Sequence, residues 1–339
     1  MPRTGRHPLK ERNLVLKEPV IASITITTIT HIPMLSGYWQ ESLEVLRLFF
    51  DSLLASTGLD FDLLVFDNAS CHEVTDYLTQ LKEEGVIQYL LLSDRNFRKL
   101  GALDFMLRAA PGEFVAYSDS DVYFLPGWLE QSLEVLKAFP QTGMVSALPT
   151  IDKANIYIQS TRKGIARAEG LLVETGTDLI PQAFIQAHQT SLGKSEAEYY
   201  SGSRQDTRVT FQGTSAYLSA QDFQFLTTKD VIRQVLPLRV EEGAEDYDPI
   251  YSPVFEAKID RAGYWRLSTA DYLVHHMGNS VPDLAEELKE IAPGLDFSEK
   301  VAEKADSKTK LVCRFYNSHR GRKMLKKIYT WSYRKLFEE

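Results

Sequence analysis

The sequence is poor in cysteine and has no long hydrophobic run. Its two cysteines, Cys71 and Cys313, lie far apart and match no metal-binding or redox spacing. No apolar stretch approaches the roughly 20 residues that cross a bilayer. Residues 1–17 contain charges but lack the hydrophobic core of a signal peptide. We therefore expect a cytoplasmic protein with two unpaired thiols.

Acidic and basic residues are unevenly distributed along the chain. The formal net charge is -8, yet residues 308–337 hold ten Lys or Arg and no Asp or Glu, so the rest of the chain carries -18. An acidic body disfavours general nucleic-acid binding. The basic segment also contains Met324, Leu325, Ile328 and Trp331 at near-helical spacing. It forms either an amphipathic helix that contacts an anionic lipid surface, at the inner face of a membrane, or a C-terminal helix docked on the acidic body.

Strand-like and helix-like segments alternate through the first 150 residues. Apolar and β-branched runs predict strands at 21–29, 61–66, 86–92, 113–117 and 144–148, and helical patterns lie between them. Ser70 and Glu73 have the spacing of a capping box at the start of the second helix. This alternation predicts right-handed βαβ units and a mostly parallel sheet flanked by helices. In such sheets ligands bind beyond the carboxyl ends of the strands, which is where Asp67, Asp119 and Asp121 fall.

The pattern becomes irregular between residues 149 and 208, where Gly, Ser and Thr cluster among mixed charges. We interpret this part as an insertion or acceptor-side lobe rather than more of the regular sheet. Order returns at 209–219, and a strand is expected to end at His275-His276.

Asp119 and Asp121 stand two residues apart just after a predicted strand. If the backbone stays extended, both carboxylates point the same way. Two hard oxygen ligands on one side suit Mg²⁺ or Mn²⁺ shared with phosphate oxygens. The alternative is a solvated turn, since a D-x-D sequence alone is common.

Five motifs follow one another between residues 21 and 130. They are Ile26-Thr-Thr-Ile-Thr30, Val65-Phe-Asp-Asn-Ala-Ser70, Asp94-Arg-Asn-Phe-Arg-Lys-Leu-Gly101, Pro111-Gly-Glu-Phe-Val-Ala-Tyr-Ser-Asp-Ser-Asp121 and Phe124-Leu-Pro-Gly-Trp128. In this order they resemble the family 2 glycosyltransferases of the GT-A fold. The resemblance implies a GT-A type, Rossmann-like sheet with an acceptor-side lobe and, after it, a C-terminal helical tail.

The resemblance also implies roles for individual residues in binding the donor. The first strand, with Thr27 and Thr28, would wrap the base of a nucleotide-diphosphate sugar, and Asp67 would read uracil. Asn96, Lys99, Asp119 and Ser120 complete the expected donor-binding set. Asp67 alone could equally be a turn-forming residue, and Lys99 part of a solvated loop.

Further downstream, the resemblance implies a catalytic base and a third metal ligand. The base would be Asp246 of Glu245-Asp246, with Asp248 as its rival and an acidic surface loop as the alternative. Asp119, Asp121 and His276 would hold Mn²⁺ or Mg²⁺. His275 competes with His276, and an ordinary structural histidine is the commoner fate of either.

The implied activity is transfer of a sugar from a nucleotide-diphosphate donor, UDP-linked by the Asp67 motif, to the hydroxyl of a saccharide or lipid-linked acceptor. Inversion rests on the resemblance, so a retaining enzyme remains open. A processive synthase is disfavoured because no Gln-x-x-Arg-Trp motif occurs. The alternatives are a nucleotidyltransferase, although residues 27–33 contain no glycine for a phosphate loop, and a non-catalytic nucleotide or carbohydrate binder. The expected division is a donor half at 20–150, an acceptor half at 151–295 and a basic helical tail at 296–339.

Overall fold

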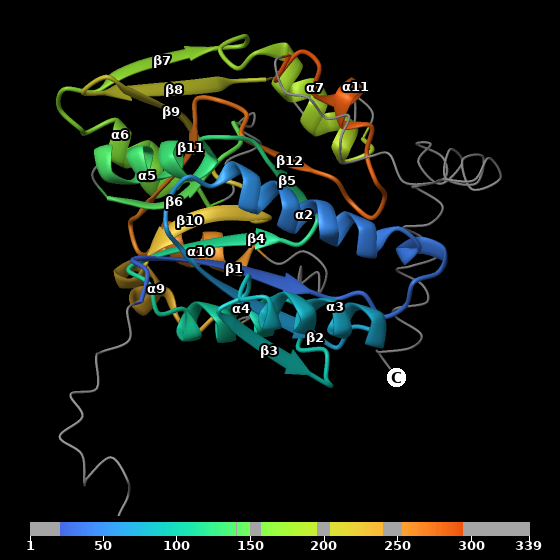
Figure 1. Cartoon of the computed structure of the whole chain (residues 1–339). Coiled ribbons are helices and arrows are strands. Elements are labelled where there is room, and N and C mark those ends of the chain that lie inside the picture. The colour runs from blue at the N-terminus through green and yellow to red at the C-terminus, as the bar shows by residue number, and fades with distance from the viewer. Residues whose placement is uncertain (1–20, 140, 150–156, 195–203, 240–252, 294–339) are drawn as a thin grey trace, which may run out of the picture.

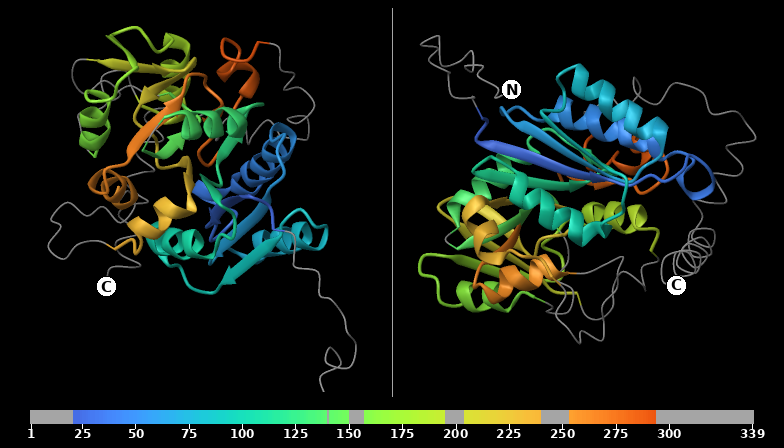
Figure 2. Two further views of the ribbon diagram at one scale, coloured as in Figure 1. Left: turned by 90° about the vertical axis from the view of Figure 1, so that its left-hand side faces the viewer. Right: turned by 90° about the horizontal axis from the view of Figure 1, so that it is seen from below.

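The structure, a computed structural model, describes residues 21–139, 141–149, 157–194, 204–239 and 253–293. These residues build a ten-stranded sheet with helices on both faces and, beside it, a two-stranded sheet (Figures 1 and 2). The large sheet has the strand order β3-β2-β1-β4-β10-β6-β11-β9-β8-β7. The α/β class predicted from the alternating pattern is therefore confirmed.

The first half of the sheet is parallel. It contains β1 (Ile24–Thr30), β2 (Asp62–Asn68), β3 (Tyr89–Ser93) and β4 (Phe114–Asp119). The connecting helices are α2 (Ser42–Ser56), α3 (His72–Glu83) and α4 (Arg98–Ala109). Successive residues of β2 point to opposite faces, so Leu63 and Val65 enter the core under α2 and α3, whereas Leu64 and Phe66 enter the core under α4. Both faces of these strands are thus covered, as parallel sheets require.

The second half of the sheet is mixed. β10 (Gln224–Thr228) lies antiparallel between β4 and β6 (Thr142–Ser146), and β11 (Trp265–Thr269) runs parallel to β6. β9 (Thr214–Leu218), β8 (Asp206–Phe211) and β7 (Leu172–Gly176) extend it antiparallel. The accompanying helices are α5 (Trp128–Ala138), α6 (Gln159–Ile165), α7 (Gln182–Ser191), α9 (Lys229–Val235) and α10 (Val254–Arg261). The region expected to be irregular thus contributes α6, β7 and α7.

A second sheet joins two distant parts of the chain. β5 (Val122–Phe124) pairs antiparallel with β12 (Val274–His276), with His276 opposite Val122. The short helix α11 (Leu284–Glu287) follows β12, and the 3-10 turn η1 (Gly37–Trp39) precedes α2. Through this pairing the end of β12 is held beside the turn after β4, so residues more than 150 positions apart become neighbours.

One local prediction is wrong. The helix α3 begins at His72 with Cys71 as its N-cap, and no side chain caps it. Ser70 Oγ instead accepts a hydrogen bond from the backbone N–H of Ile32, at 3.0 Å. The hydroxyl therefore ties the loop after β1 to the loop after β2, and no capping box forms with Glu73. Among the described residues, no helix has the length and apolarity to cross a membrane.

We expect Gly164→Ala to destabilise the fold. A Cβ at position 164 would lie 2.0 Å from Nε1 of Trp265, whose side chain is buried. Overpacking of this kind costs about 1–3 kcal/mol in the free energy of unfolding. Urea denaturation measures the effect, and Lys163→Ala, an exposed change in the same helix, should shift the unfolding free energy by less than about 0.5 kcal/mol. Equal stabilities of the two variants would contradict the packing argument.

Candidate active site

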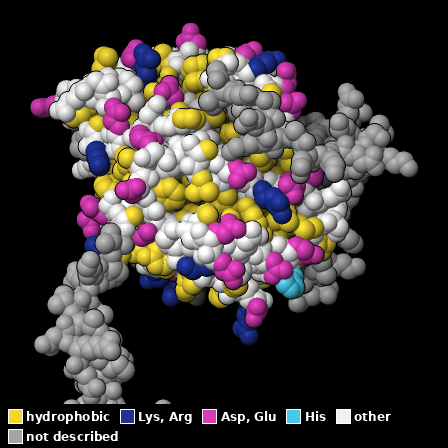
Figure 3. Space-filling model, viewed as in Figure 1, with side chains coloured by type: hydrophobic (Ala, Val, Ile, Leu, Met, Phe, Trp, Pro, Cys, Tyr) yellow, Lys and Arg dark blue, Asp and Glu magenta, His cyan; other side chains and the backbone are white. Residues whose placement is uncertain are grey.

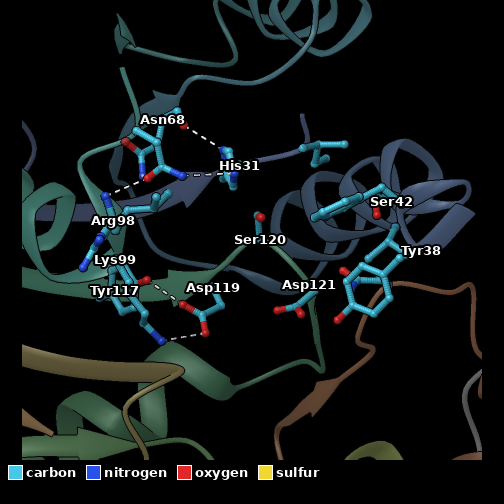
Figure 4. A pocket seen from close by; sticks show the side chains of 16 residues that line it. His31, Tyr38, Ser42, Asn68, Arg98, Lys99, Tyr117, Asp119, Ser120 and Asp121 are labelled. Carbon is cyan, nitrogen blue, oxygen red and sulfur yellow. Dashed lines mark hydrogen bonds and ion pairs between the residues drawn. The ribbon is translucent and has the colours of Figure 1, made fainter. Parts of the chain in front are cut away.

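A cavity of about 330 Å³ opens at the carboxyl ends of β1, β2 and β4 (Figure 4). Its volume is at the lower end of the range for small-molecule sites. One end presents amide, imidazole and cationic groups, the other aromatic side chains, and two carboxylates lie between them. The residues that line it include His31, Asn68, Asn96, Arg98, Lys99, Tyr117, Asp119, Ser120, Asp121, Tyr38 and Trp39.

His31, Asn68 and Asn96 form a hydrogen-bonded network at the polar end. His31 Nδ1 lies 2.8 Å from the backbone oxygen of Asn68, which can only accept, so Nδ1 carries the proton. Nε2 therefore accepts from Asn96 Nδ2, at 3.1 Å, and Asn96 Oδ1 accepts from Asn68 Nδ2 and from the backbone N–H of Arg98. Burial lowers the pKa of His31, although the Asn68 carbonyl opposes this. His31 is thus a neutral imidazole of one tautomer.

Each side-chain acceptor of this network already receives a hydrogen bond. Asn68 Oδ1 accepts from the backbone N–H of Phe97 at 2.7 Å, and His31 Nε2 and Asn96 Oδ1 accept from the donors just named. The network therefore offers amide hydrogens to the cavity, next to Arg98 and Lys99. Arg98 starts α4 with φ of 58°, a left-handed conformation that costs energy for a non-glycine residue. Sequence reasoning singled out Asn96 and Lys99 here but missed His31.

Three predicted donor-binding residues do not line the cavity. Thr27 and Thr28 lie buried within β1, and Thr27 Oγ1 donates to the carbonyl of Ala116 at 2.9 Å. Asp67 is also buried: its Oδ2 accepts from the N–H of Ser70, and its Oδ1 has no hydrogen-bond partner among the described residues. Burial raises the pKa of Asp67, although hydrogen bonds from Ser70 oppose this.

Asp119 ends β4 and is held from two sides. Its Oδ2 accepts from Lys99 Nζ at 2.8 Å, and its Oδ1 accepts from the hydroxyl of Tyr117 at 2.5 Å (Figure 4). Burial and repulsion from Asp121 and Asp222 raise the pKa of Asp119, although Lys99 opposes them. This cluster of carboxylates is therefore short of positive charge.

Asp121 faces His276 because β5 pairs with β12. The backbone N–H of Met277 donates to the carbonyl of Asp121 at 2.7 Å, and His276 Nε2 lies 3.3 Å from Asp121 Oδ2. Burial lowers the pKa of His276, but the Asp121 carboxylate more than offsets this and raises it. The structure thus brings His276 to Asp121, so two of the three residues predicted to hold a metal are in contact.

These residues fit a divalent cation in part. Asp121 Oδ1 and His276 Nδ1 are buried without a hydrogen-bond partner among the described residues. The other two polar atoms of this pair, Asp121 Oδ2 and His276 Nε2, lie 3.3 Å apart, and carboxylate oxygen and imidazole nitrogen would both suit a divalent cation. Asp119 is instead engaged by Lys99, and within the described ranges no three His, Cys, Asp or Glu side chains already converge as a metal cluster.

His275 has a different environment from His276. It is fully buried, and its Nδ1 lies 2.8 Å from the hydroxyl of Tyr272 while its Nε2 lies 3.0 Å from Oε2 of Glu287. Neighbouring residues of a strand point to opposite sides, so one histidine ties α11 to the core and the other faces Asp121. Because successive side chains of β12 alternate between its two sides, the two histidines that the sequence left as alternative metal ligands lie in different environments.

A second set of buried charges lies behind Lys99 and was missed by sequence reasoning. Asp222 Oδ2 is 3.5 Å from Lys99 Nζ. Burial beside Asp222 raises the pKa of Glu256, in α10, to about 7, although Arg266 opposes this. Arg266 is held by the carbonyls of Tyr157 and Ala220. No motif marks these residues, because they meet only through β10, β11 and α10.

Acidic and basic side chains are mixed on the surface drawn in Figure 3. On the face drawn in Figure 3, acidic side chains are spread among basic ones, and apolar side chains form a band across the middle. The described residues of this face form no continuous basic surface of the kind that nucleic-acid-binding proteins use. The predicted base Asp246, its rival Asp248 and the basic segment 308–337 lie outside the described residues.

The fold and the position of the cavity indicate a class of protein. A Rossmann-like α/β sheet with a polar cavity at the carboxyl ends of its parallel strands is typical of ligand-binding proteins. Residues 38–188, which include most of this cavity, match the sequence model described as glycosyl transferase family 2. Through that segment the chain is similar to this family.

Other known proteins show more distant similarity. A glycosyltransferase of Nostoc sp. (strain PCC 7120), alr2836, is 29% identical over 130 residues, which span 37% of this chain and 40% of that protein. A mannosyltransferase from Pyrobaculum calidifontis, solved with GDP-Man and Mn²⁺, aligns with a TM-score of 0.40 and 15% identity over 78% of this chain and 56% of that one. S. aureus TarS 1–349 with UDP-GlcNAc aligns with a TM-score of 0.41 and 14% identity, over 82% and 69%.

The raised pKa of Glu256 predicts that the free energy of unfolding depends on pH. Its pKa is about 7 in the folded protein against an ordinary value of 4.5, so the folded state binds a proton that the unfolded state has released between these values. The contribution is fully present below pH 4.5 and is lost as the pH rises through 7, a change of about 3 kcal/mol in the free energy of unfolding.

Urea denaturation between pH 4.5 and 8 measures this contribution. Glu256→Gln should remove it, so the variant should gain stability relative to the unchanged protein as the pH rises. Glu286→Gln alters an exposed carboxylate and should leave the pH profile as it is. Parallel profiles for the Glu256 variant and the unchanged protein would contradict the assignment.

Proposed function

We propose that this protein is a metal-dependent glycosyltransferase that moves a sugar from a nucleotide-diphosphate donor, UDP-linked by the Asp67 motif, to an acceptor hydroxyl. The observation that carries the proposal is the approach of His276 to Asp121, which lines the cavity together with Asp119 in a segment that matches the family 2 model. Carboxylates and imidazole aimed at one place suit Mn²⁺ or Mg²⁺.

The donor's phosphates would lie along the polar end of the cavity. Arg98 and Lys99 supply positive charge there, and the amide groups of Asn68 and Asn96 supply hydrogen-bond donors. Both suit phosphate oxygens, which only accept. We retain Asp67 as the reader of the base because its unpaired Oδ1 matches the N3–H of a pyrimidine. For the base to reach it, the neighbouring network of His31, Asn68 and Asn96 would have to open.

Asp119, Asp121 and His276 would hold the cation, which when bound supplies Lewis-acid stabilisation of the leaving diphosphate. Asp121 is the best placed of the three because one of its oxygens is unpaired among the described residues and the other faces His276. Asp119 would exchange its ion pair with Lys99 for contact with the cation. Ser120 is the single residue between these two aspartates. It also lines the cavity and would contact the donor.

A single displacement with inversion also needs a base opposite the leaving group. We assign this role to Asp246, with Asp248 as the alternative. The described helix α10 begins at Val254, so the base motif belongs to the segment that leads into this helix. The acceptor is a saccharide or a lipid-linked saccharide, bound by residues of the 151–295 half, and the basic segment 308–337 would serve peripheral contact with a membrane.

Asp121→Asn should abolish metal-dependent catalysis. The purified protein is incubated with UDP-sugars and GDP-sugars in the presence and absence of Mn²⁺, and release of nucleoside diphosphate is measured. We expect the variant to lose at least roughly 100-fold in rate, the effect of removing one group that stabilises developing charge. Asp230→Asn, which alters an exposed aspartate of α9, is the matched control and should keep full activity. Undiminished release by the Asp121 variant would refute the metal site.

Asp246→Asn tests the base separately from the donor site. It should lower transfer by about 100-fold or more while leaving the affinity for UDP unchanged, because a general base acts on the acceptor alone. Calorimetric titration of UDP and a transfer assay give the two values. Transfer at the unchanged rate would remove Asp246 as the base and direct attention to Asp248.

The same assays separate the remaining candidate functions. NMR of the product's anomeric proton distinguishes inversion from retention of configuration. Formation of a nucleotide sugar and pyrophosphate from a sugar phosphate and a nucleoside triphosphate would identify a nucleotidyltransferase. Binding of a donor without any release of nucleoside diphosphate would identify a non-catalytic binder.

A further inference from the structure

Lys99 connects the proposed metal site to a carboxylate that no motif marks. Its Nζ lies 2.8 Å from Asp119 Oδ2 and 3.5 Å from Asp222 Oδ2, and 5.7 Å above the ring of Tyr117. The ammonium thus stands between two carboxylates. It is close enough to Asp222 to move from one to the other by a small rotation of its flexible stem.

Asp222 has a fixed place beside Asp119. The backbone carbonyl of Phe223, the next residue, accepts from the N–H of Asp119 at 2.7 Å. On its other side, the N–H of Gln221 donates to Ser146 Oγ at 3.1 Å. The strand pairing of β10 with β4 then continues this contact, with Gln224 opposite Ser118. Asp222 is therefore held beside Asp119 by contacts of the residues on both sides of it.

A cation bound by Asp119 and Asp121 would face the ammonium of Lys99. Lys99 now holds Asp119 Oδ2 and Tyr117 holds Oδ1, so a cation would compete for these oxygens. Two positive charges close together also repel each other. An alternative acceptor for the ammonium removes this competition. Asp222 is the carboxylate that offers it.

We propose that Asp222 is a positioning residue that receives the ammonium of Lys99 when a divalent cation binds Asp119. The inference rests on the proposed metal-dependent function and adds the exchange of partners that makes Asp119 available. Asp222 contacts neither cation nor donor in this arrangement and acts only through Lys99.

The test is the affinity for Mn²⁺ alone, measured by electron paramagnetic resonance of the free ion with the purified full chain. Asp222→Asn should weaken Mn²⁺ binding by about tenfold, because the ammonium is left with Asp119 as its only carboxylate. Lys99→Met should strengthen it, since the competitor is gone. Asp230→Asn removes the same charge at an exposed position and should leave the affinity unchanged.

The double variant separates an indirect role from a direct one. If Asp222 acts through Lys99, the penalty of Asp222→Asn should fall to less than half in the Lys99→Met background. Equal penalties in both backgrounds would mean that Asp222 attracts the ion directly and would overturn the inference. Asp222→Glu keeps a carboxylate and should restore part of the affinity.

Three further outcomes are decisive. Should Asp222→Asn fail to fold, weaker Mn²⁺ binding by Lys99→Met would by itself overturn the inference, and stronger binding would support it. If the unchanged protein binds no Mn²⁺, the metal-dependent function fails together with the inference. If binding depends on Asp121 but not on Lys99 or Asp222, the function stands and the inference alone fails.

Discussion

The site depends on a shortage of positive charge at the carboxyl end of β4. Asp119, Asp121 and Asp222 meet there, and within the described part of the chain Lys99 is the cation that contacts two of them. Carboxylates that share a partly buried space repel one another unless cations intervene. The fold tolerates this arrangement because the sheet holds each aspartate by its backbone, and the proposed divalent cation would offset the remaining repulsion.

A small sheet decides which groups join these carboxylates. β5 and β12 are short, yet their pairing carries His276 to Asp121 and turns His275 to the other side, against Tyr272 and Glu287. The buried contacts of His275 fix the orientation of the strand, because both ring nitrogens are engaged. The position of His276 therefore depends on helix α11, which follows it in the chain.

The sequence predicted most of the features that depend on residues close together in the chain. Periodicity placed β1, β2, β4 and the helices between them, and it put Asp119 and Asp121 at a strand end, since these features depend on neighbouring residues. It missed Asp222 and Glu256 because their importance arises from strand order, with β10 inserted between β4 and β6. His31 was missed for a related reason: its role comes from Asn68 and Asn96, on loops after other strands. The capping box failed because Ser70 found a tertiary partner in Ile32.

The insertion of β10 has a mechanical consequence. This strand pairs with β4 along its whole length and with β6 at Leu226 and Val145, so it joins the parallel and the mixed halves of the sheet. Rotating one part against the other would break backbone hydrogen bonds in the interior of the protein, where water cannot replace them. The two halves of the sheet are thus coupled, and any movement that admits a ligand to the cavity is expected in the loops at its rim and not between the halves.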